Sequence, residues 1–400
     1  MPITVVSGRL VLPTGVLPAG AVVVDGERIA WVGPAADLPD AFRVAPVLAA
    51  PPGGHVLPGL VDLHCHGGGG ASFPDAVDAE EALVAVREHR RHGTTTMLAS
   101  LVTAAPADLL RQVALLSGLA EDGDIAGIHL EGPFLSVARC GAQDPALILP
   151  PDAVLTRALL EAGGGHVCTM TLAPEERGAL GADGVAAALV RGGALPSWGH
   201  TDADPAAAAR ALAESLRLLG DPADAGRRPT VTHLFNAMRP WMHRDPGPAG
   251  ELLVAAREGR AVVELVGDGT HVDPAVVREV ARLVGRDGVA LVTDATAAAG
   301  MPDGAYRLGS RDVVVTGGVA RLAGGGAIAG GTAHLLDVVR VTVAAGVPLA
   351  DAVHMASAVP AAVLGLGDRG ALAAGARADV VLTDADLRPV VVLRGGAPQR

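Results

Sequence analysis

Apolar and polar positions follow two different periods along this 400-residue chain. Near both ends, short runs rich in valine and leucine are separated by turn signals, as in residues 21–34 and 378–396. The Asp-Gly pair at residues 25–26 separates two such runs and is typical of a tight β-hairpin. We therefore predict that residues 1–52 and 367–400 fold together as one small β-sandwich domain.

The middle of the chain, residues 53–366, alternates short apolar runs with alanine-rich stretches of helical periodicity. Residues 78–93 and 204–220 are typical of helices, and Asp204 before Pro205 fits an N-cap. Strands that alternate with helices indicate a parallel sheet, and about eight such units indicate an α/β fold, the (β/α)8 TIM-like barrel. The apolar runs expected as strands include 94–102, 125–132, 167–174, 229–236, 262–269 and 289–295.

Composition and charge exclude several functions. The net charge of −12 and the pI near 5.5 argue against a nucleic-acid or anionic-membrane partner. All 31 basic residues are arginine, which excludes lysine Schiff-base catalysis, a P-loop and a carboxylated-lysine metal bridge. Cys65, Cys140 and Cys168 are too few and too scattered for a disulfide framework. With neither a signal peptide nor a membrane-spanning run in view, we expect a cytoplasmic protein.

Histidine and carboxylate side chains recur where the expected strands end. His64 and His66 share one face because side chains alternate along a strand, and so do His129 and Glu131. A single histidine is more often a hydrogen-bonded core or surface residue, and an aspartate before a helix can be a simple cap. Strand ends of a barrel converge on one mouth, however, so their joint occurrence indicates a metal site. Further candidates at strand ends are His200, His233 and Asp294.

Six motifs carry a resemblance to a known family. In chain order they read PGLVDLHCHG, HLEGPF, GHTDA, THLFNAM, GDGTH and VTDA. This series resembles the N-acetylglucosamine-6-phosphate deacetylases of the amidohydrolase superfamily, and the match runs along nearly the whole chain. The resemblance implies a barrel flanked by a β module built from both chain ends. It also implies hydrolysis of N-acetylglucosamine 6-phosphate to glucosamine 6-phosphate and acetate.

The same resemblance implies a metal-dependent enzyme. Glu131, His200 and His233 would bind one divalent metal, for which zinc suits one carboxylate and two imidazoles with a position left for water. His64 and His66 would hold a second ion in those relatives that keep both histidines. We therefore expect one or two ions per subunit, with zinc as the expected metal.

Catalytic and substrate roles also come from the resemblance. Asp294 matches the family's catalytic aspartate. It would take a proton from metal-activated water during attack on the acetamide carbonyl, and then return it to the departing amine. The sugar phosphate would contact Asn236 and the backbone of Ala237, and His271 would also contact the substrate.

Two residues carry finer expectations. Arg244 matches a family arginine that reaches the phosphate from the neighbouring subunit, so the resemblance implies a homodimer. The alternative for Arg244 is an ordinary surface residue in a polar loop. Gln143 stands where many members have a histidine that helps to polarise the acetyl group. A glutamine amide can donate a hydrogen bond but cannot become cationic.

Two other functions stay open at this point. One is another amidohydrolase, such as a nucleobase deaminase or cyclic amidase, although HLFNAM and Arg244 suit a phosphorylated amino sugar better. A deaminase would release ammonia, whereas a deacetylase releases acetate. The other is a non-catalytic barrel that binds a sugar phosphate. Such a binder has no need of a metal-binding set together with the base Asp294.

Overall fold

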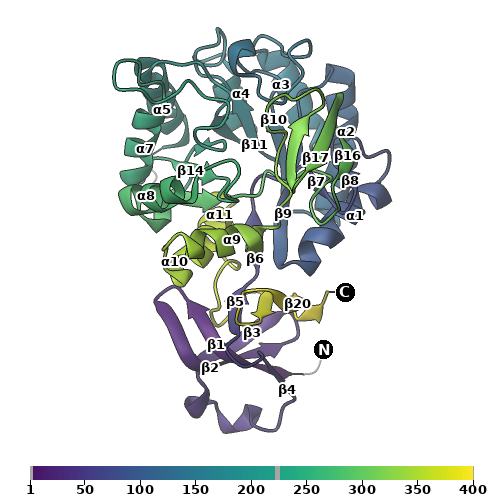
Figure 1. Cartoon of the computed structure of the whole chain (residues 1–400), viewed down its shortest axis with the longest axis vertical. Coiled ribbons are helices and arrows are strands. Elements are labelled where there is room, and N and C mark those ends of the chain that lie inside the picture. Colours follow the sequence, from purple (N-terminus) through teal and green to yellow (C-terminus); the bar gives the residue numbers. More distant parts are fainter. Residues whose placement is uncertain (1–2, 221–225, 400) are drawn as a thin grey trace.

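In the computed structural model, which describes residues 3–220 and 226–399, a barrel sits above a smaller β module (Figure 1). Its eight-stranded sheet is parallel throughout, and its strand order follows the chain. A bridge between Cys65 and Ala295, just beyond the first and last strands, brings the sheet edges together. The predicted TIM-like fold class is thus confirmed. The strands are β6 (Leu60–Asp62), β9 (Thr94–Leu101), β10 (Gly127–Glu131), β11 (Val167–Leu172), β12 (Leu195–Trp198), β13 (Thr230–Val231), β14 (Val262–Leu265) and β15 (Val289–Leu291).

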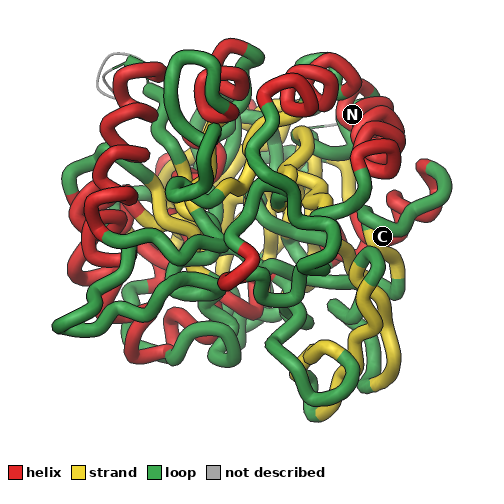
Figure 2. The backbone as a smooth tube through the Cα atoms, turned by 90° about the horizontal axis from the view of Figure 1, so that it is seen from above, coloured by secondary structure: helices red, strands yellow, loops and turns green. Residues whose placement is uncertain are grey.

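Helices surround the strands, as the view from above shows (Figure 2). Both predicted helices form, as α1 (Ala79–Arg91) and α5 (Pro205–Leu219). Asp204 caps α5 by accepting a hydrogen bond from the Ala207 N–H at 2.7 Å. Within the described ranges, no helix has the length and apolar composition that crossing a bilayer requires. The other helices are α2 (Pro106–Glu121), α3 (Ala153–Ala162), α4 (Val185–Arg191), α7 (Ala249–Arg257), α8 (Pro274–Val284), α9 (Leu335–Ala344), α10 (Leu349–Met355) and α11 (Ala358–Val363).

The two ends of the chain meet in the β module. β5 joins them, because it pairs in parallel with β1 and antiparallel with β19. The predicted hairpin forms between β2 and β3, where Asp25 pairs with Arg28. Residues 1, 2 and 400 lie outside the described residues, and domain boundaries at 52–53 and 366–367 stay a prediction. The strands are β1 (Thr4–Leu12), β2 (Gly15–Asp25), β3 (Arg28–Pro34), β4 (Val47–Ala49), β5 (His55–Pro58), β19 (Val380–Thr383), β20 (Pro389–Arg394) and β21 (Ala397–Pro398).

Burial on both faces explains the continuous apolar runs of the barrel strands. Every residue of β9 is buried, because the barrel interior lies on one side and the helices lie on the other. On β14, Val263 and Leu265 pack into the outer core, whereas Val262 packs into a different core cluster. Glu264 lies between Val263 and Leu265, so its charged side chain is on the strand face opposite to that outer core.

A three-stranded antiparallel sheet follows β15, and our sequence analysis did not predict it. Its strands are β16 (Gly304–Leu308), β17 (Arg311–Thr316) and β18 (Val319–Leu322). The burial of β17 alternates residue by residue, and Gly-Ser and Gly-Gly pairs separate the three strands. This alternation with a period of two indicates strands. We did not predict them because we expected strands to alternate with helices in this part of the chain. Two further short strands, β7 (Gly67–Gly68) and β8 (Ala71–Ser72), pair beside the mouth of the barrel.

Candidate metal centre and active site

A cavity of about 240 Å³ opens where the barrel strands end. Most of the predicted site residues line it. His64 does not line the cavity and is fully buried. Arg244 does not line it either, because it lies exposed on a surface loop. The predicted residues that do line the cavity are His66, Glu131, Gln143, His200, His233, Asn236, Ala237, His271 and Asp294.

The first group of metal-capable side chains comes from three of the barrel strands, β10, β12 and β13. Glu131 is the last residue of β10, and His200 and His233 follow the ends of β12 and β13. Glu131 Oε1 lies 3.0 Å from His200 Nε2 and 2.9 Å from His233 Nε2, and the two nitrogens are 3.0 Å apart. Ligands that bind one zinc ion at about 2.0–2.1 Å lie at similar separations.

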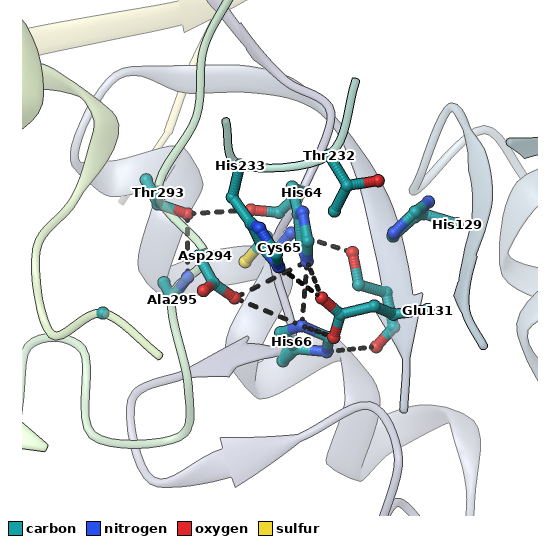
Figure 3. Close-up of polar contacts among 12 residues, drawn as sticks. His64, Cys65, His66, His129, Glu131, Thr232, His233, Thr293, Asp294 and Ala295 are labelled. Atoms are coloured by element: carbon teal, nitrogen blue, oxygen red, sulfur yellow. Dashed lines mark hydrogen bonds and ion pairs between the residues drawn. The ribbon is translucent and has the colours of Figure 1, made fainter. Parts of the chain in front are cut away.

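The second group shares Glu131 with the first. His64 Nε2 and His66 Nε2 lie 3.0 Å apart, and they are 3.5 Å from Oε1 and 3.3 Å from Oε2 of Glu131, respectively. Asp294 Oδ1 approaches the same two nitrogens, at 3.5 and 3.3 Å. In Figure 3, these histidines lie between the carboxylates of Glu131 and Asp294. Glu131 therefore belongs to both groups of metal-capable side chains.

The outward nitrogens of these rings show that the site suits a cation. His66 Nδ1 lies 3.1 Å from the Ser100 carbonyl, and His200 Nδ1 lies 2.9 Å from the Arg139 carbonyl. A carbonyl oxygen can only accept, so each Nδ1 must carry the proton. In the neutral ring, Nε2 then presents a lone pair toward Glu131. Lone pairs and a carboxylate that converge repel one another unless a cation lies between them, so the residues fit a divalent metal.

Burial and charge shift the pKa values of the same residues. Burial opposes protonation of His64, but the carboxylates of Glu131, Asp294 and Glu264 outweigh it and raise its pKa to about 10. Burial disfavours ionisation of Asp294, yet His64 and His66 hold its pKa below the usual value. The pKa of Glu131 is likewise lowered against its burial, mainly by His64 and His200. The electrostatic field of the carboxylates at this site therefore strongly favours positive charge.

Left-handed backbone conformations are concentrated at this site. His200, His233 and Asp294 have φ angles of 47°, 28° and 48°, and Ala237 has 49°. Residues other than glycine seldom adopt this region, and such conformations cluster at functional sites. Each of these residues lies just after a strand end or in the loop that follows it. The turns there direct the side chains into the cavity instead of continuing the strand.

Gln143 is held by two hydrogen bonds. Its Oε1 accepts from the Thr103 N–H at 2.8 Å, and its Nε2 donates to Glu131 Oε2 at 2.5 Å. The Thr103 N–H can only donate, so it sets which end of the amide faces Glu131. One N–H of Gln143 thus contacts Glu131, and the second is not used in either bond. The predicted contact of Gln143 with the acetyl group would have to use that second N–H.

The residues predicted to contact the substrate line the same cavity. His271 Nδ1 is 2.8 Å from Asp268 Oδ2, and its Nε2 is 3.8 Å from Asp294 Oδ2. Burial lowers the pKa of His271, but the bond to Asp268 outweighs it and raises the pKa. Asn236 Nδ2 donates to the His233 carbonyl at 3.2 Å, which fixes its amide near the rim. Asp268 was not singled out in the sequence, although it lies within the GDGTH motif.

Two more buried carboxylates support the histidine pair. Asp62 Oδ1 accepts from the His64 and Thr293 N–H groups at 3.2 and 3.3 Å, and so ties the first barrel strand to the last. Glu264 Oε2 lies 3.2 Å from His64 Nδ1. Glu264 was not predicted from the sequence. The only signal was a lone charge within the apolar run VVELV.

A third group of metal-capable residues lies elsewhere, where α1 meets the start of α9. Glu88 Oε1 is 3.0 Å from His334 Nε2 and 3.3 Å from His92 Nδ1. The two imidazole rings are stacked, with centroids 3.6 Å apart and an interplanar angle of 10°. Their in-plane lone pairs therefore cannot converge on one ion, and Arg91 already pairs with Glu88 at 2.6 Å. We interpret this group as a hydrogen-bonded helix contact.

Comparison with known proteins places this geometry in a family. The amidohydrolase family profile matches residues 55–398, and a profile for an imidazolonepropionase-like composite domain of bacteria matches residues 20–43. An N-acetylglucosamine-6-phosphate deacetylase from Bacillus subtilis (strain 168) is 33% identical over 372 residues, covering 87% of this chain and 85% of the relative. An N-acetylgalactosamine-6-phosphate deacetylase from Escherichia coli O157:H7 is 33% identical, covering 83% and 84%.

The solved structures agree. A mutant N-acetyl-D-glucosamine-6-phosphate deacetylase from Mycobacterium smegmatis, in complex with N-acetyl-D-glucosamine-6-phosphate, is 43% identical, with a TM-score of 0.88. The match covers 100% of this chain and 99% of that one. Fold and sequence therefore agree along nearly the whole length. This chain belongs to the amidohydrolase family, among its N-acetylglucosamine-6-phosphate deacetylases.

Proposed function

We propose that this chain hydrolyses N-acetylglucosamine 6-phosphate to glucosamine 6-phosphate and acetate, with Asp294 as its general acid–base residue. The observation that carries the proposal is the position of Asp294, which lines the cavity and lies on the side of His64 and His66 away from Glu131. A carboxylate placed there can take a proton from a water molecule and give one to a leaving amine on the same face of an amide.

The ion would be held by Glu131, His200 and His233, and a second one by Glu131 with His64 and His66. When bound, a divalent ion polarises an amide carbonyl and lowers the pKa of water toward about 7. Asp294 accepts the proton that the attacking water loses as its oxygen bonds to the acetyl carbon. It then donates that proton to the sugar nitrogen as the carbon–nitrogen bond breaks, because an unprotonated amine leaves poorly.

Substrate recognition is assigned to residues on the rim of the cavity. Asn236 and the backbone of Ala237 would bind the phosphate end, and His271 would contact the sugar. The second N–H of Gln143 is available for the acetyl carbonyl, because the first is bound to Glu131. We propose the glucosamine sugar as the substrate. The galactosamine sugar is the alternative to be measured, because the E. coli relative bears that name.

We propose zinc as the metal, since two imidazoles and one carboxylate form a common catalytic zinc set. Cytoplasmic location is also proposed, because Cys65, Cys140 and Cys168 are all free, as is usual in a reducing compartment.

The protein is further proposed to be a homodimer. Arg244 lies exposed on the loop 239–247, together with Trp241 and Met242, which are 55% and 57% exposed. An apolar groove between this loop and α8 lies next to them. A second subunit seated here would cover these apolar side chains. Arg244, which does not line the cavity of its own chain, would then be free to reach the cavity of the partner.

Acetate release tests the function directly. The protein is stripped with a chelator, reloaded with zinc, and assayed on N-acetylglucosamine with and without the 6-phosphate, and on the galactosamine isomer. We expect zinc-dependent release of acetate, without ammonia, from the phosphorylated glucosamine sugar. Equal activity of the stripped and reloaded protein would contradict the metal-dependent mechanism.

A further inference from the structure

Glu264 is a buried carboxylate that the proposed mechanism does not use. It lies on β14 and is only 1% exposed. A carboxylate buried without partners is costly, so its hydrogen bonds indicate its role. Among the described residues, both polar contacts of its side chain are with residues of the candidate metal groups. Oε2 lies 3.2 Å from His64 Nδ1, and it accepts a hydrogen bond from the His233 N–H at 3.3 Å.

The contact with His64 orients an imidazole. A carboxylate oxygen can only accept, so the neutral ring carries its proton on Nδ1 and its lone pair on Nε2. That Nε2 is the atom that faces His66 and Glu131, at 3.0 and 3.5 Å. A carboxylate behind a metal-binding histidine selects the tautomer in this way, and it makes the ring a stronger ligand.

The contact with His233 holds a backbone. β13 pairs with β14 only at Thr230 and Val231, after which the chain turns. The Glu264 carboxylate then accepts a hydrogen bond from the His233 N–H. The main-chain carbonyl of Glu264 accepts one from the Leu234 N–H at 2.9 Å. The side chain thereby takes the place of a main-chain acceptor and supports the left-handed conformation of His233, whose φ is 28°.

We propose that Glu264 is a positioning residue that holds a ligand of each candidate metal group in place: the ring of His64 in one and the backbone of His233 in the other. This inference rests on the proposed function, because it assumes that these histidines bind the metal. One oxygen serves both donors, so the two groups are mechanically linked through β14. Changing this single carboxylate is therefore expected to weaken zinc binding at both.

Glu264→Gln tests the proposal, because the amide keeps the shape of the side chain. The amide oxygen carries no charge and is a weaker acceptor than a carboxylate oxygen, and the NH2 group would face a donor if the amide turned. Zinc affinity of the stripped protein is measured by competition with a chelating dye. We expect a loss of about 10- to 100-fold, the usual effect of removing such a partner. Glu88→Gln is the matched control, since Glu88 is also buried beside histidines but contacts neither candidate metal group, and it should leave zinc affinity unchanged.

Two further measurements separate positioning from a general structural effect. Glu264→Asp keeps the charge but is shorter, so it should also weaken zinc binding, and it decides the question if Glu264→Gln does not fold. In a His64→Ala background, Glu264→Gln should cost less affinity than in the original protein, because one of its two contacts is already lost. Equal losses in both backgrounds would show that Glu264 does not act through His64.

The outcomes distinguish this inference from the proposed function. If the zinc-loaded protein releases acetate and Glu264→Gln binds zinc as tightly and in the same amount as the original, the inference is wrong and the function stands. If the original protein is equally active with and without zinc, the proposed function itself fails.

Discussion

At the scale of the residue, the candidate base depends on its backbone. Asp294 has a φ of 48°, and both of its main-chain groups are bonded: its N–H donates to the His64 carbonyl at 2.9 Å, and its carbonyl accepts from the Gly331 N–H at 2.6 Å. Aspartate and asparagine tolerate this left-handed region better than other side chains with a Cβ. The position of the carboxylate is thus set mainly by the turn that carries it.

Asp294→Asn is therefore expected to keep the fold and lose the chemistry. Asparagine fits the same backbone but cannot take up a proton, so kcat should fall by about 10²- to 10⁴-fold. Acetate release measures kcat, and thermal unfolding and zinc content serve as controls and should remain close to the original values. A variant that still turned over at more than about a tenth of the original rate would remove Asp294 from the base role.

His89 provides a second prediction at this scale, on pH. It is fully buried on α1, and its Nε2 lies 2.8 Å from the Gly67 carbonyl, next to the histidine pair. Burial, with help from His334, lowers its pKa from 6.5 to about 4. The folded protein therefore favours the neutral ring. The unfolded chain takes up the proton first as pH falls, so this contribution is complete above pH 6.5 and is lost toward pH 4.

His89→Gln should remove that dependence while keeping a donor for the Gly67 carbonyl. The free energy of unfolding, measured with urea at several pH values, should fall more steeply for the original protein than for the variant below pH 6.5. The gap between the two curves should change by up to about 3 kcal/mol. Parallel curves would show that His89 does not titrate in this way.

At the scale of the element, the sheet β16–β18 supports the loop that carries Gln143. Ser310 Oγ donates to Asp144 Oδ2 at 3.0 Å, and the Gly309 N–H donates to Asp75 Oδ2 at 3.1 Å. Leu308, at the end of β16, lines the cavity beside Gln143. The antiparallel sheet thus forms one wall of the cavity and anchors the loop that carries Gln143.

Asp144→Ala should loosen this wall without changing the chemistry. The variant loses the bond from Ser310, and also the bond from the Ala146 N–H and the ion pair with Arg311. A hydrogen bond is worth about 1 kcal/mol, so loss of the Ser310 contact alone corresponds to about a fivefold rise in KM if its whole effect falls on substrate binding. The value of kcat and the zinc content should stay the same. Asp303→Ala, just before β16 and bonded to the Gly317 and Gly318 N–H groups instead, is the matched control. If both variants raise KM equally, the anchor at residue 144 has no special role.

At the scale of the whole molecule, the barrel and the β module are packed together through α10, which contacts β1 and β15 (Figure 1). The module lies below the barrel in that view. The phosphate end of the site is the part that depends on a partner in the proposed dimer.

Arg244→Ala and Trp241→Asp should separate assembly from phosphate binding. Arg244→Ala should stay dimeric but raise KM for the phosphorylated sugar by about 10- to 100-fold, as expected for a charged hydrogen bond worth about 1.5–3 kcal/mol. Trp241→Asp should give monomers in light scattering and raise the same KM. Neither should affect slow turnover of the unphosphorylated sugar. Equal effects on both sugars would contradict the phosphate role of Arg244.

Much of the site was predictable from the sequence because its candidate metal ligands end apolar runs. Side chains alternate along a strand, so His64 and His66 had to share a face, and so did His129 and Glu131. Parallel strands of a barrel end at one mouth, which is why residues 131, 200, 233 and 294 could be expected to meet. The sequence by itself therefore determined the fold class and most of the residues around the cavity.

Only the tertiary structure decided which side chains support them. His64 and Glu264 are separated by 200 positions, and Gln143 contacts Thr103 and Glu131 from a loop without a periodic pattern. A strand pattern states which side a residue faces, but not which neighbour it meets there. That neighbour depends on the order and stagger of the strands around the barrel, and these arise from packing along the whole chain.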